Sequence, residues 1–257
     1  MTMLLAGAVA TLVFCAPGYP GAAGDAQPFL DAFAVAVAQA AKWPAGSLKA
    51  TYDATEEGGL AKLATPEAAL ALVPFPFFVE HAVALKLAPL VQADVTAVGF
   101  KEHWTLVAKK GRVSGPASLS GYSILSIAGY APDFVRGYAL ADWALPADVK
   151  ISQSAQVLSV LRRIAAGEQS TALLDATQMG ALASLPFAGE LQAVKESAPL
   201  PTAILAVVDA RVPKTQVAPL RAALLSMSGS AANAEVLANL RLRGFVVPQL
   251  PPAPSRP

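Results

Sequence analysis

The sequence predicts an α/β fold, because strand-like apolar runs alternate with helix-like amphipathic stretches along most of the chain. Over residues 10–77 the expected order is strand, helix, strand, short helix and strand. The run from Ala68 to Val73 is continuously apolar, which is typical of a strand that is buried on both faces of a parallel sheet. A second alternating series begins near Trp104. This order favours an open sheet covered by helices.

Turn and cap residues divide the first series into its elements. Prolines and glycines over residues 17–21 break the first strand and open a helix. The sequence Pro74-Phe75-Pro76-Phe77 is expected to end the third strand abruptly and to hold the chain extended. The expected elements are strands at 10–16, 48–52 and 68–73, a helix that Asp25 caps and Trp43-Pro44 ends, and a short helix from Thr55.

The second series follows the same signals. Ser154 is the expected N-cap, and Gly167 the C-terminal stop, of an amphipathic helix whose apolar face includes Leu158 and Leu161. The tail from Pro248 is rich in proline and is expected to be disordered. The other expected elements are strands at 104–108, 122–125, 149–151, 171–174, 191–195 and 203–208, and helices at 132–141, 214–226 and 233–240.

Composition and charge exclude several classes of protein. The 257 residues are 54% hydrophobic and 14% charged, which allows a large core in one or two domains. Nineteen basic and 18 acidic residues give a net charge of +1, and the lack of a basic run argues against a nucleic-acid partner. The single cysteine, Cys15, excludes an internal disulfide framework. With two histidines and no His/Cys group, no metal site is expected.

The N-terminal segment is apolar but lacks the features of a complete targeting signal. Residues 1–24 carry no charged side chain, whereas a secretory signal needs a positive n-region, and the first lysine is Lys42. Phe14 stands before Cys15, where a lipoprotein site needs a small residue. Residues 17–21 break any helix before it could span a bilayer. We expect residues 10–16 to be a buried strand and the signal peptide to be trimmed from this chain; an uncleaved membrane anchor is the alternative.

The stretch from Leu119 to Val135 combines a turn, a short strand and a loop that ends at Gly129 before a helix. Pro132 suits an early helical position, and Asp133 complements the positive end of the helix. Such a loop presents backbone N–H groups that can receive an anion or a carbonyl-rich ligand. An ordinary strand-to-helix turn is the alternative interpretation.

This stretch resembles the phosphonate-binding family of periplasmic substrate-binding proteins, the receptors that feed ABC transporters. In that family a Leu-x-Gly turn introduces a strand that leads into a Ser-Thr-Ser-Gly loop at a helix start. Here the turn is Leu119-Ser120-Gly121 and the loop is Ser126-Ile127-Ala128-Gly129, so two of the family's hydroxyls are replaced. The resemblance extends from about Leu12 to Val247.

The resemblance implies a two-lobed, type II periplasmic binding protein fold with two hinge strands, near residues 104–108 and 203–208. Lobe 1 then comprises residues 10–103 plus 203–247, lobe 2 residues 104–202, and the Pro-rich tail residues 248–257. Ligands of open α/β sheets sit beyond the carboxyl ends of the strands, so loops at these ends should line a cleft. The expected ligand-binding residues are Tyr19, Tyr52, Phe75, Phe77, Trp104, Ser126, Ile127, Ala128, Gly129, Tyr130, Asp175 and Gln178.

Signals for catalysis are weak. The sequence contains no G-x-S-x-G elbow, P-loop, Rossmann glycine fingerprint or H-E-x-x-H motif. His81 and His103 have no nucleophile nearby in the sequence, so we expect structural or surface roles for both. The acidic pair Glu56-Glu57 is better explained by the dipole of the helix that it begins. We therefore expect no catalysis and no cofactor, with an enzyme on the same scaffold as an alternative.

The residues expected at the cleft bear on the ligand. Phe75 and Phe77 form either an apolar wall of the cleft or part of the first lobe's core. With hydroxyls missing at Ile127 and Ala128, we expect a ligand that is apolar with one polar group, such as a lipid or sterol. A phosphonate- or phosphate-type anion is the alternative. The chain is expected to be a periplasmic monomer that captures this ligand between its lobes and delivers it to a membrane transporter.

Overall fold

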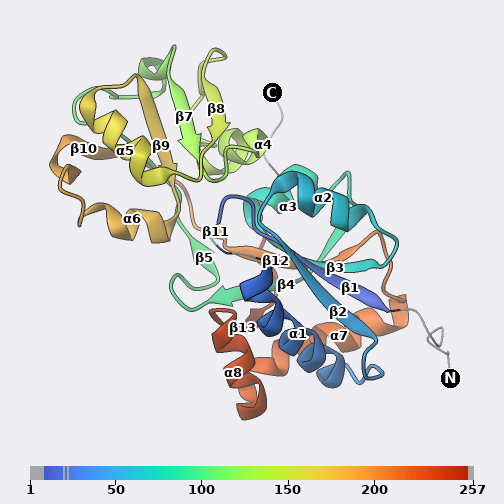
Figure 1. The fold of residues 1–257 in the computed structure, drawn as a ribbon. Coiled ribbons are helices and arrows are strands. Elements are labelled where there is room, and N and C mark those ends of the chain that lie inside the picture. Colours follow the sequence, from blue (N-terminus) through green and yellow to red (C-terminus); the bar gives the residue numbers. More distant parts are fainter. Residues whose placement is uncertain (1–8, 20, 22, 254–257) are drawn as a thin grey trace. The chain divides into compact units, whose positions relative to one another are not determined.

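The computed structural model describes residues 9–253 except residues 20 and 22, and it divides into two compact units (Figure 1). Unit 1 takes the described residues up to Phe100 together with Pro201–Gln249. Unit 2 takes Lys101–Leu200 and the described residues 250–253. Each unit contains strands and helices around its own sheet, which confirms the predicted α/β class. The expected sequence features at residues 1–8 and 254–257 lie outside the described residues.

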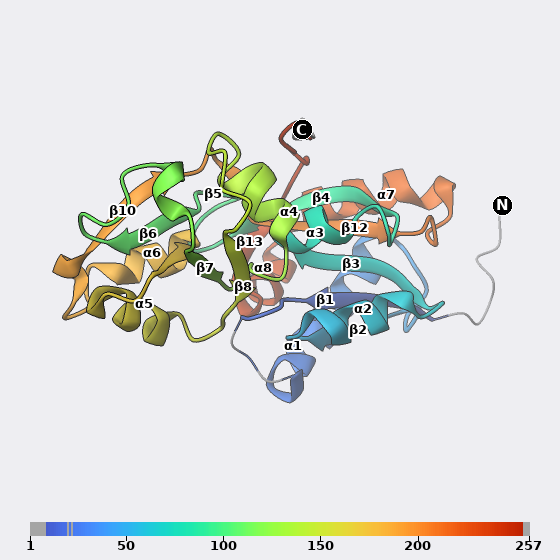
Figure 2. The same ribbon diagram turned by 90° about the horizontal axis from the view of Figure 1, so that it is seen from above.

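Unit 1 is built on a six-stranded sheet in the order β13-β4-β12-β3-β1-β2. Strand β1 is parallel to β2 and β3, whereas β12 is antiparallel to both β3 and β4, and β13 is antiparallel to β4. Figure 2 shows β3 and β12 side by side in this sheet. The strands are β1 (Ala10–Cys15), β2 (Leu48–Asp53), β3 (Ala68–Pro74), β4 (Leu87–Val95), β12 (Ala203–Val208) and β13 (Leu242–Val246).

Helices cover both faces of this sheet. In Figure 1, α1, α7 and α8 lie on one face and α2 and α3 on the other. The core on the first face joins Phe33 of α1 and Leu220 of α7 to strand residues such as Leu70 and Val91, and each of these four is 0% exposed. The helices are α1 (Ala23–Ala40), α2 (Glu56–Ala64), α3 (Phe75–His81), α7 (Lys214–Ser226) and α8 (Ala231–Asn239).

Unit 2 is built on a five-stranded sheet in the order β10-β6-β9-β7-β8. Strands β7, β8 and β9 are parallel, and β6 is antiparallel to β9 and β10. Apolar residues of α5 and α6 pack on one face of it, for example Leu161 and Leu182 near Ala172. The elements are β6 (Thr105–Lys109), β7 (Ser123–Ser126), α4 (Pro132–Phe134) with a π-helical turn (Val135–Ala139), β8 (Lys150–Gln153), α5 (Val157–Ala166), β9 (Ser170–Leu174), α6 (Ala176–Leu182) and β10 (Leu191–Glu196).

The chain passes between the units at two short strands that pair with each other. These are β5 (Lys101–Glu102) and β11 (Leu200–Pro201), which form a two-stranded sheet. The sequence placed the crossings at 104–108 and 203–208, but those residues form β6 and β12, which belong to the main sheets. The predicted crossings were wrong by a few residues, because the longer apolar runs are more prominent in the sequence than the short paired strands β5 and β11 beside them.

Three further expectations are corrected by the structure. Residues 75–77 are not extended: Phe75 begins α3, because proline is compatible with the first turn of a helix and Pro76 occupies it. Strands β4 and β13 were not expected at all. The N-cap of α5 is Gln156 rather than Ser154, whose hydroxyl instead accepts a hydrogen bond from the Gln156 amide at 3.3 Å.

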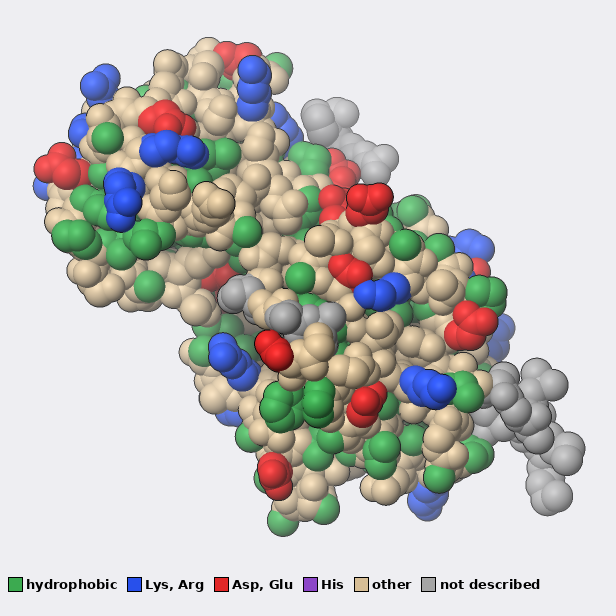
Figure 3. Space-filling model, viewed as in Figure 1, with side chains coloured by type: hydrophobic (Ala, Val, Ile, Leu, Met, Phe, Trp, Pro, Cys, Tyr) green, Lys and Arg blue, Asp and Glu red, His purple; other side chains and the backbone are tan. Residues whose placement is uncertain are grey.

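The described surface carries charges of both signs. On the face drawn in Figure 3, basic and acidic side chains are interspersed over both units. Within the described residues, no helix has the length and apolar character required to cross a bilayer.

Candidate functional site

The residues expected to bind ligand in unit 2 gather at one edge of its sheet, which we call the carboxyl edge. Because β7, β8 and β9 are parallel, their carboxyl ends meet there, and the loop 126–130 follows β7. Strand β6 enters at the same edge, since Thr105 lies opposite Leu174 of the antiparallel β9. Trp104 therefore comes close to Asp175, although 70 residues separate them along the chain.

Ser126 fixes the loop to the sheet. Its hydroxyl donates to the Leu173 carbonyl oxygen at 2.7 Å and accepts from the Ala128 amide at 3.1 Å. Its own carbonyl oxygen accepts from the Ser154 amide at 2.8 Å. The side chain is 2% exposed. In this structure the Ser126 hydroxyl therefore holds the loop in shape, and its bonding capacity is directed into the protein.

Gly129 is required by a close approach of two backbones. A Cβ atom at this position would lie 2.1 Å from the carbonyl oxygen of Ser152 and 2.5 Å from the amide nitrogen of Gln153. The Gln153 side-chain amide donates to the Ile127 carbonyl oxygen at 3.4 Å. Gln153 was not among the residues expected at the site, and no local signal in the sequence marks it, because its place opposite Ser126 depends on the register of β7 with β8. The side chains of Ile127 and Ala128 are buried.

Two carboxyl groups lie at the start of α6. Asp175 is the N-cap: its Oδ1 accepts from the Gln178 backbone amide at 2.7 Å, and the Asp175 backbone amide donates to the Gln178 side-chain Oε1 at 3.2 Å. This capping box explains why both residues stand at the end of β9. Glu102 belongs to β5, one of the two short strands at which the chain passes between the units. Its Oε2 atom accepts from the Ala176 amide at 3.4 Å. Burial, together with the charge of Asp175, raises the pKa of Glu102 to about 8.

Trp104 contributes a buried donor to this edge. Its indole is 1% exposed and packs edge-on against Phe134, with ring centroids 5.1 Å apart. Its backbone amide donates to the Ser197 hydroxyl at 2.9 Å. Its side-chain Nε1–H finds no acceptor among the described residues. A buried donor without a partner costs free energy, so it calls for an explanation, such as a functional role, a bound ion or an ordered water.

The candidates of unit 1 also lie at the carboxyl ends of parallel strands. Phe14 of β1 stands opposite Tyr52 of β2 and Leu72 of β3, so Tyr19, Tyr52 and Phe75 follow the same edge. Tyr52 is half-buried, and this burial raises its pKa.

Polar groups near this edge of unit 1 are paired with one another. Lys62 Nζ donates to Asp53 Oδ2 and to the Tyr52 carbonyl oxygen, both at 2.6 Å. Burial opposes ionisation of Asp53, yet the hydrogen bonds from Lys62 and Thr55 lower its pKa. Burial raises the pKa of the Cys15 thiol to about 12, which makes this side chain an unreactive part of the core.

Phe75 and Phe77 occupy α3, and both are buried. Phe77 packs on the His81 ring with centroids 4.6 Å apart and lies near Gly59 of α2. Phe75 stacks on Phe78 at 6.5 Å. The His81 Nε2 atom lies 2.9 Å from Glu56 Oε1, which ties α3 to the start of α2. These contacts give Phe77 and His81 structural roles within unit 1. Whether the two phenylalanines touch ligand stays a prediction.

Comparison with known proteins identifies the family. The sequence profile described as "ABC transporter, phosphonate, periplasmic substrate-binding protein" matches residues 107–250, more than half of the chain. The chain belongs to this family. It is therefore a periplasmic solute-binding protein of the phosphonate type, the component of an ABC transporter that binds a small-molecule substrate for a membrane partner. The resemblance read from Leu119-Ser120-Gly121 and residues 126–129 is confirmed.

Solved structures show the same fold. XAC2383 from Xanthomonas citri, bound to ATP, superposes with a TM-score of 0.68 at 14% sequence identity. The match covers 95% of this chain and 92% of the XAC2383 chain. PhnD1 from Prochlorococcus marinus, in complex with methylphosphonate, gives 0.59 at 11% identity, with 93% of both chains covered. A binding-protein component of the ABC phosphonate transporter from Pseudomonas aeruginosa gives 0.57 at 13%, covering 92% and 80%. No curated protein sequence matches. The two-lobed periplasmic binding protein fold is thus confirmed.

Proposed function

We propose that this family member binds a small ligand with a phosphonate- or phosphate-type oxyanion at the carboxyl edge of unit 2, without catalysis. The family match favours this ligand class over the lipid- or sterol-like one that the sequence suggested, and nothing in the comparisons supports the latter. The observation that carries the proposal is the Nε1–H of Trp104, a buried donor without an acceptor at the edge where binding residues of this fold class lie.

An oxyanion would satisfy this donor. Indole Nε1 is a donor only, so its partner must be an acceptor such as a phosphonate oxygen. A hydrogen bond to an ionised acceptor is stronger than one between neutral groups, and burial strengthens it further. The Trp104 ring is held by Phe134 and by the backbone bond to Ser197, so the donor is positioned before a ligand arrives.

The ionisation of Glu102 is consistent with an anionic ligand. With a pKa of about 8, this carboxyl is mostly protonated at pH 7, which leaves fewer negative charges beside an incoming oxyanion. A protonated carboxyl can also donate a hydrogen bond. Above pH 8 the added charge of Glu102 would oppose binding of an anion. This arrangement gives the proposal a pH dependence that an apolar ligand would not share.

One observation favours a second candidate, a ligand that is apolar with one polar end. Ile127 and Ala128 stand where the family's loop carries hydroxyls, and their side chains offer no hydrogen bonds. Titration calorimetry with methylphosphonate and inorganic phosphate separates the two candidates. Saturable binding of either anion, weakened when Trp104 is replaced by phenylalanine, supports the oxyanion receptor. Binding of neither, with binding of a single-headed lipid, supports the second candidate.

A further inference from the structure

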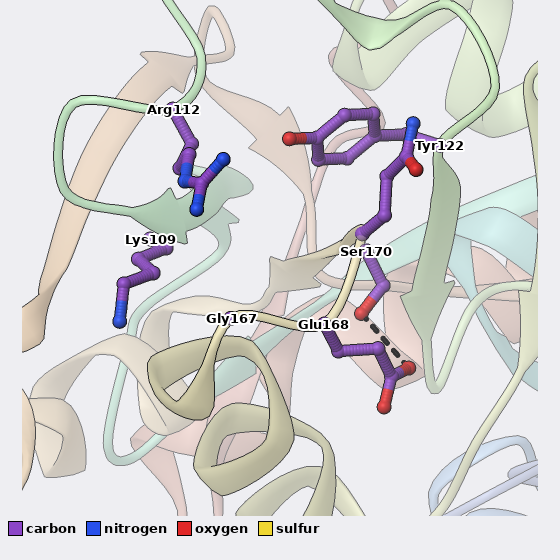
Figure 4. A pocket seen from close by; sticks show the side chains of 7 residues that line it. Lys109, Arg112, Tyr122, Gly167, Glu168 and Ser170 are labelled. Atoms are coloured by element: carbon purple, nitrogen blue, oxygen red, sulfur yellow. Dashed lines mark hydrogen bonds between the residues drawn. The ribbon is translucent and has the colours of Figure 1, made fainter.

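A polar cavity lies at the opposite edge of the unit 2 sheet from the loop 126–130. Its volume is about 290 Å³ (Figure 4). Tyr122 precedes β7 and Ser170 begins β9, so both stand at the amino ends of these parallel strands, and Lys109 ends the antiparallel β6 beside them. Gly167, the left-handed cap of α5, forms another part of the wall. The cavity and the carboxyl edge are thus separated by the length of the strands.

The cavity carries an excess of positive charge. Arg112 lines it and makes no ion pair with any described residue. Glu168, the lining carboxylate, is already engaged: Arg163 Nε lies 3.0 Å from its Oε2, and the Ser170 hydroxyl donates to its Oε1 at 3.1 Å. Lys109 donates to the Ala165 carbonyl at the end of α5, and its only ion pair with another described residue is a long one of 3.7 Å to the exposed Glu190.

Two of the donors face one another across the cavity. In Figure 4 the Arg112 guanidinium and the Tyr122 hydroxyl point toward one another across the space, with Lys109 on the side of Arg112. The Gln169 side-chain amide also lines the wall and lies against the turn at Gly121. A guanidinium fork with a neighbouring hydroxyl is a geometry that suits planar or tetrahedral oxyanions. The volume falls at the lower limit of small-molecule pockets, so only a small ligand fits.

We propose that this cavity is a second anion site, independent of the carboxyl edge, that takes a small oxyanion of the phosphate or carboxylate class. Arg112 supplies the charge, Tyr122 and Gln169 supply further hydrogen bonds, and Lys109 adds to the positive field while it caps α5. The lining is too polar for a lipid.

Amide NMR of the full chain tests the site, with inorganic phosphate and succinate titrated separately at constant ionic strength. The expected result is saturable shifts of the Gly167 and Gln169 amides with at least one probe. Arg112→Gln should raise the Kd about 10-fold or more, because a charge-assisted fork is lost. Tyr122→Phe should have a smaller effect. Arg162→Gln, which removes the same charge from an exposed position of α5 outside the cavity lining, should leave the Kd unchanged.

Two outcomes overturn the proposal: the absence of saturable shifts at Gly167 and Gln169 with both probes, or the same Kd in Arg112→Gln and wild type. The Gly129 amide reports separately on the carboxyl edge. Shifts at Gly129 alone would support the oxyanion receptor and reject the second site. Shifts at Gly167 and Gln169 alone would support the second site and reject the oxyanion receptor.

Discussion

Glu102 and Asp175 bring two carboxyl groups to the same helix start, Glu102 through the Ala176 amide at 3.4 Å and Asp175 as the N-cap of α6. Glu102 belongs to one of the two short strands by which the chain passes between its units. Burial and the charge of Asp175 raise the pKa of Glu102 from 4.5 to about 8. The Glu102 carboxyl, which titrates near neutral pH, therefore lies on a strand that connects the two units and also beside the proposed site.

This arrangement predicts the pH dependence of stability. Between pH values of about 4.5 and about 8, the folded state keeps the Glu102 proton whereas the unfolded chain loses it. The Glu102 carboxyl therefore stabilises the folded state least at high pH, where it is ionised. Its contribution to the free energy of unfolding should fall as pH rises from about 4.5 to about 8, by up to about 1.4 kcal/mol per pH unit. Glu102→Gln should remove this fall, and denaturant unfolding at pH 5, 7 and 9 measures it. If the exposed control Glu190→Gln changes the profile as much as Glu102→Gln, the assignment to Glu102 is wrong.

Gly129 offers a prediction about the loop. Gly129→Ala would place a Cβ 2.1 Å from a backbone carbonyl oxygen of β8, so the loop or the strand must move. We expect a lower melting temperature and weaker binding of methylphosphonate. Gly180→Ala is the matched control, because a Cβ there meets open space within α6, and alanine should stabilise the helix by about 0.5–1 kcal/mol. Equal melting temperatures for the two variants would contradict the close approach.

Substitution of Phe77 distinguishes a structural role for this side chain from a contact with ligand. Because it packs on His81 and near Gly59, Phe77→Ala should cost about 3–5 kcal/mol of folding stability. Phe29→Ala, at a 43% exposed position of α1, should cost much less. Denaturant unfolding measures both costs. A selective loss of ligand binding in Phe77→Ala with unchanged unfolding would instead make Phe77 a ligand contact.

The loop positions where this chain departs from its family offer a gain-of-function prediction. Ile127→Thr with Ala128→Ser restores two hydroxyls. If each donates to a bound oxyanion, affinity for methylphosphonate should rise about 10- to 100-fold per hydroxyl, from about 1.5–3 kcal/mol for a hydrogen bond to a charged group. Ala131→Ser makes the same chemical change just beyond the loop, at a buried position, and should not raise affinity. Unchanged calorimetric affinity in the double variant would place the oxyanion elsewhere.

Most elements of the fold could be predicted from local pattern. The strand at Ala203–Val208 and the helix at Lys214–Ser226 have the predicted bounds. An uninterrupted apolar run marks the strand, and the helix forms although Pro219 lies inside it. Strand β4 could not be found in this way. Pro89, Gln92 and Asp94 interrupt its pattern, yet it lies inside the sheet between β12 and β13. The buried Gln92 is satisfied there by Phe100 and Gln249, partners that no local pattern shows.

The candidate site was predictable only in part, for a related reason. The loop 126–130 was found because strand, glycine and helix signals follow one another along the chain. Trp104, Glu102 and Asp175 lie near one another only because β6 pairs antiparallel with β9. This pairing joins residues about 70 positions apart in the sequence. Periodicity does not determine which distant strands pair. The role of Gln153 depends on the parallel register of β7 and β8 in the same way.

The most direct test of the oxyanion receptor is titration calorimetry of methylphosphonate with the wild type, Trp104→Phe and the control Trp143→Phe. Trp104→Phe keeps a ring beside Phe134 but removes the buried Nε1–H, which has no acceptor among the described residues. We predict micromolar binding by the wild type and by Trp143→Phe, and about 10- to 100-fold weaker binding by Trp104→Phe, with thermal unfolding used to check that this variant is folded. Absence of binding by the wild type, or equal affinity in Trp104→Phe, would contradict the account.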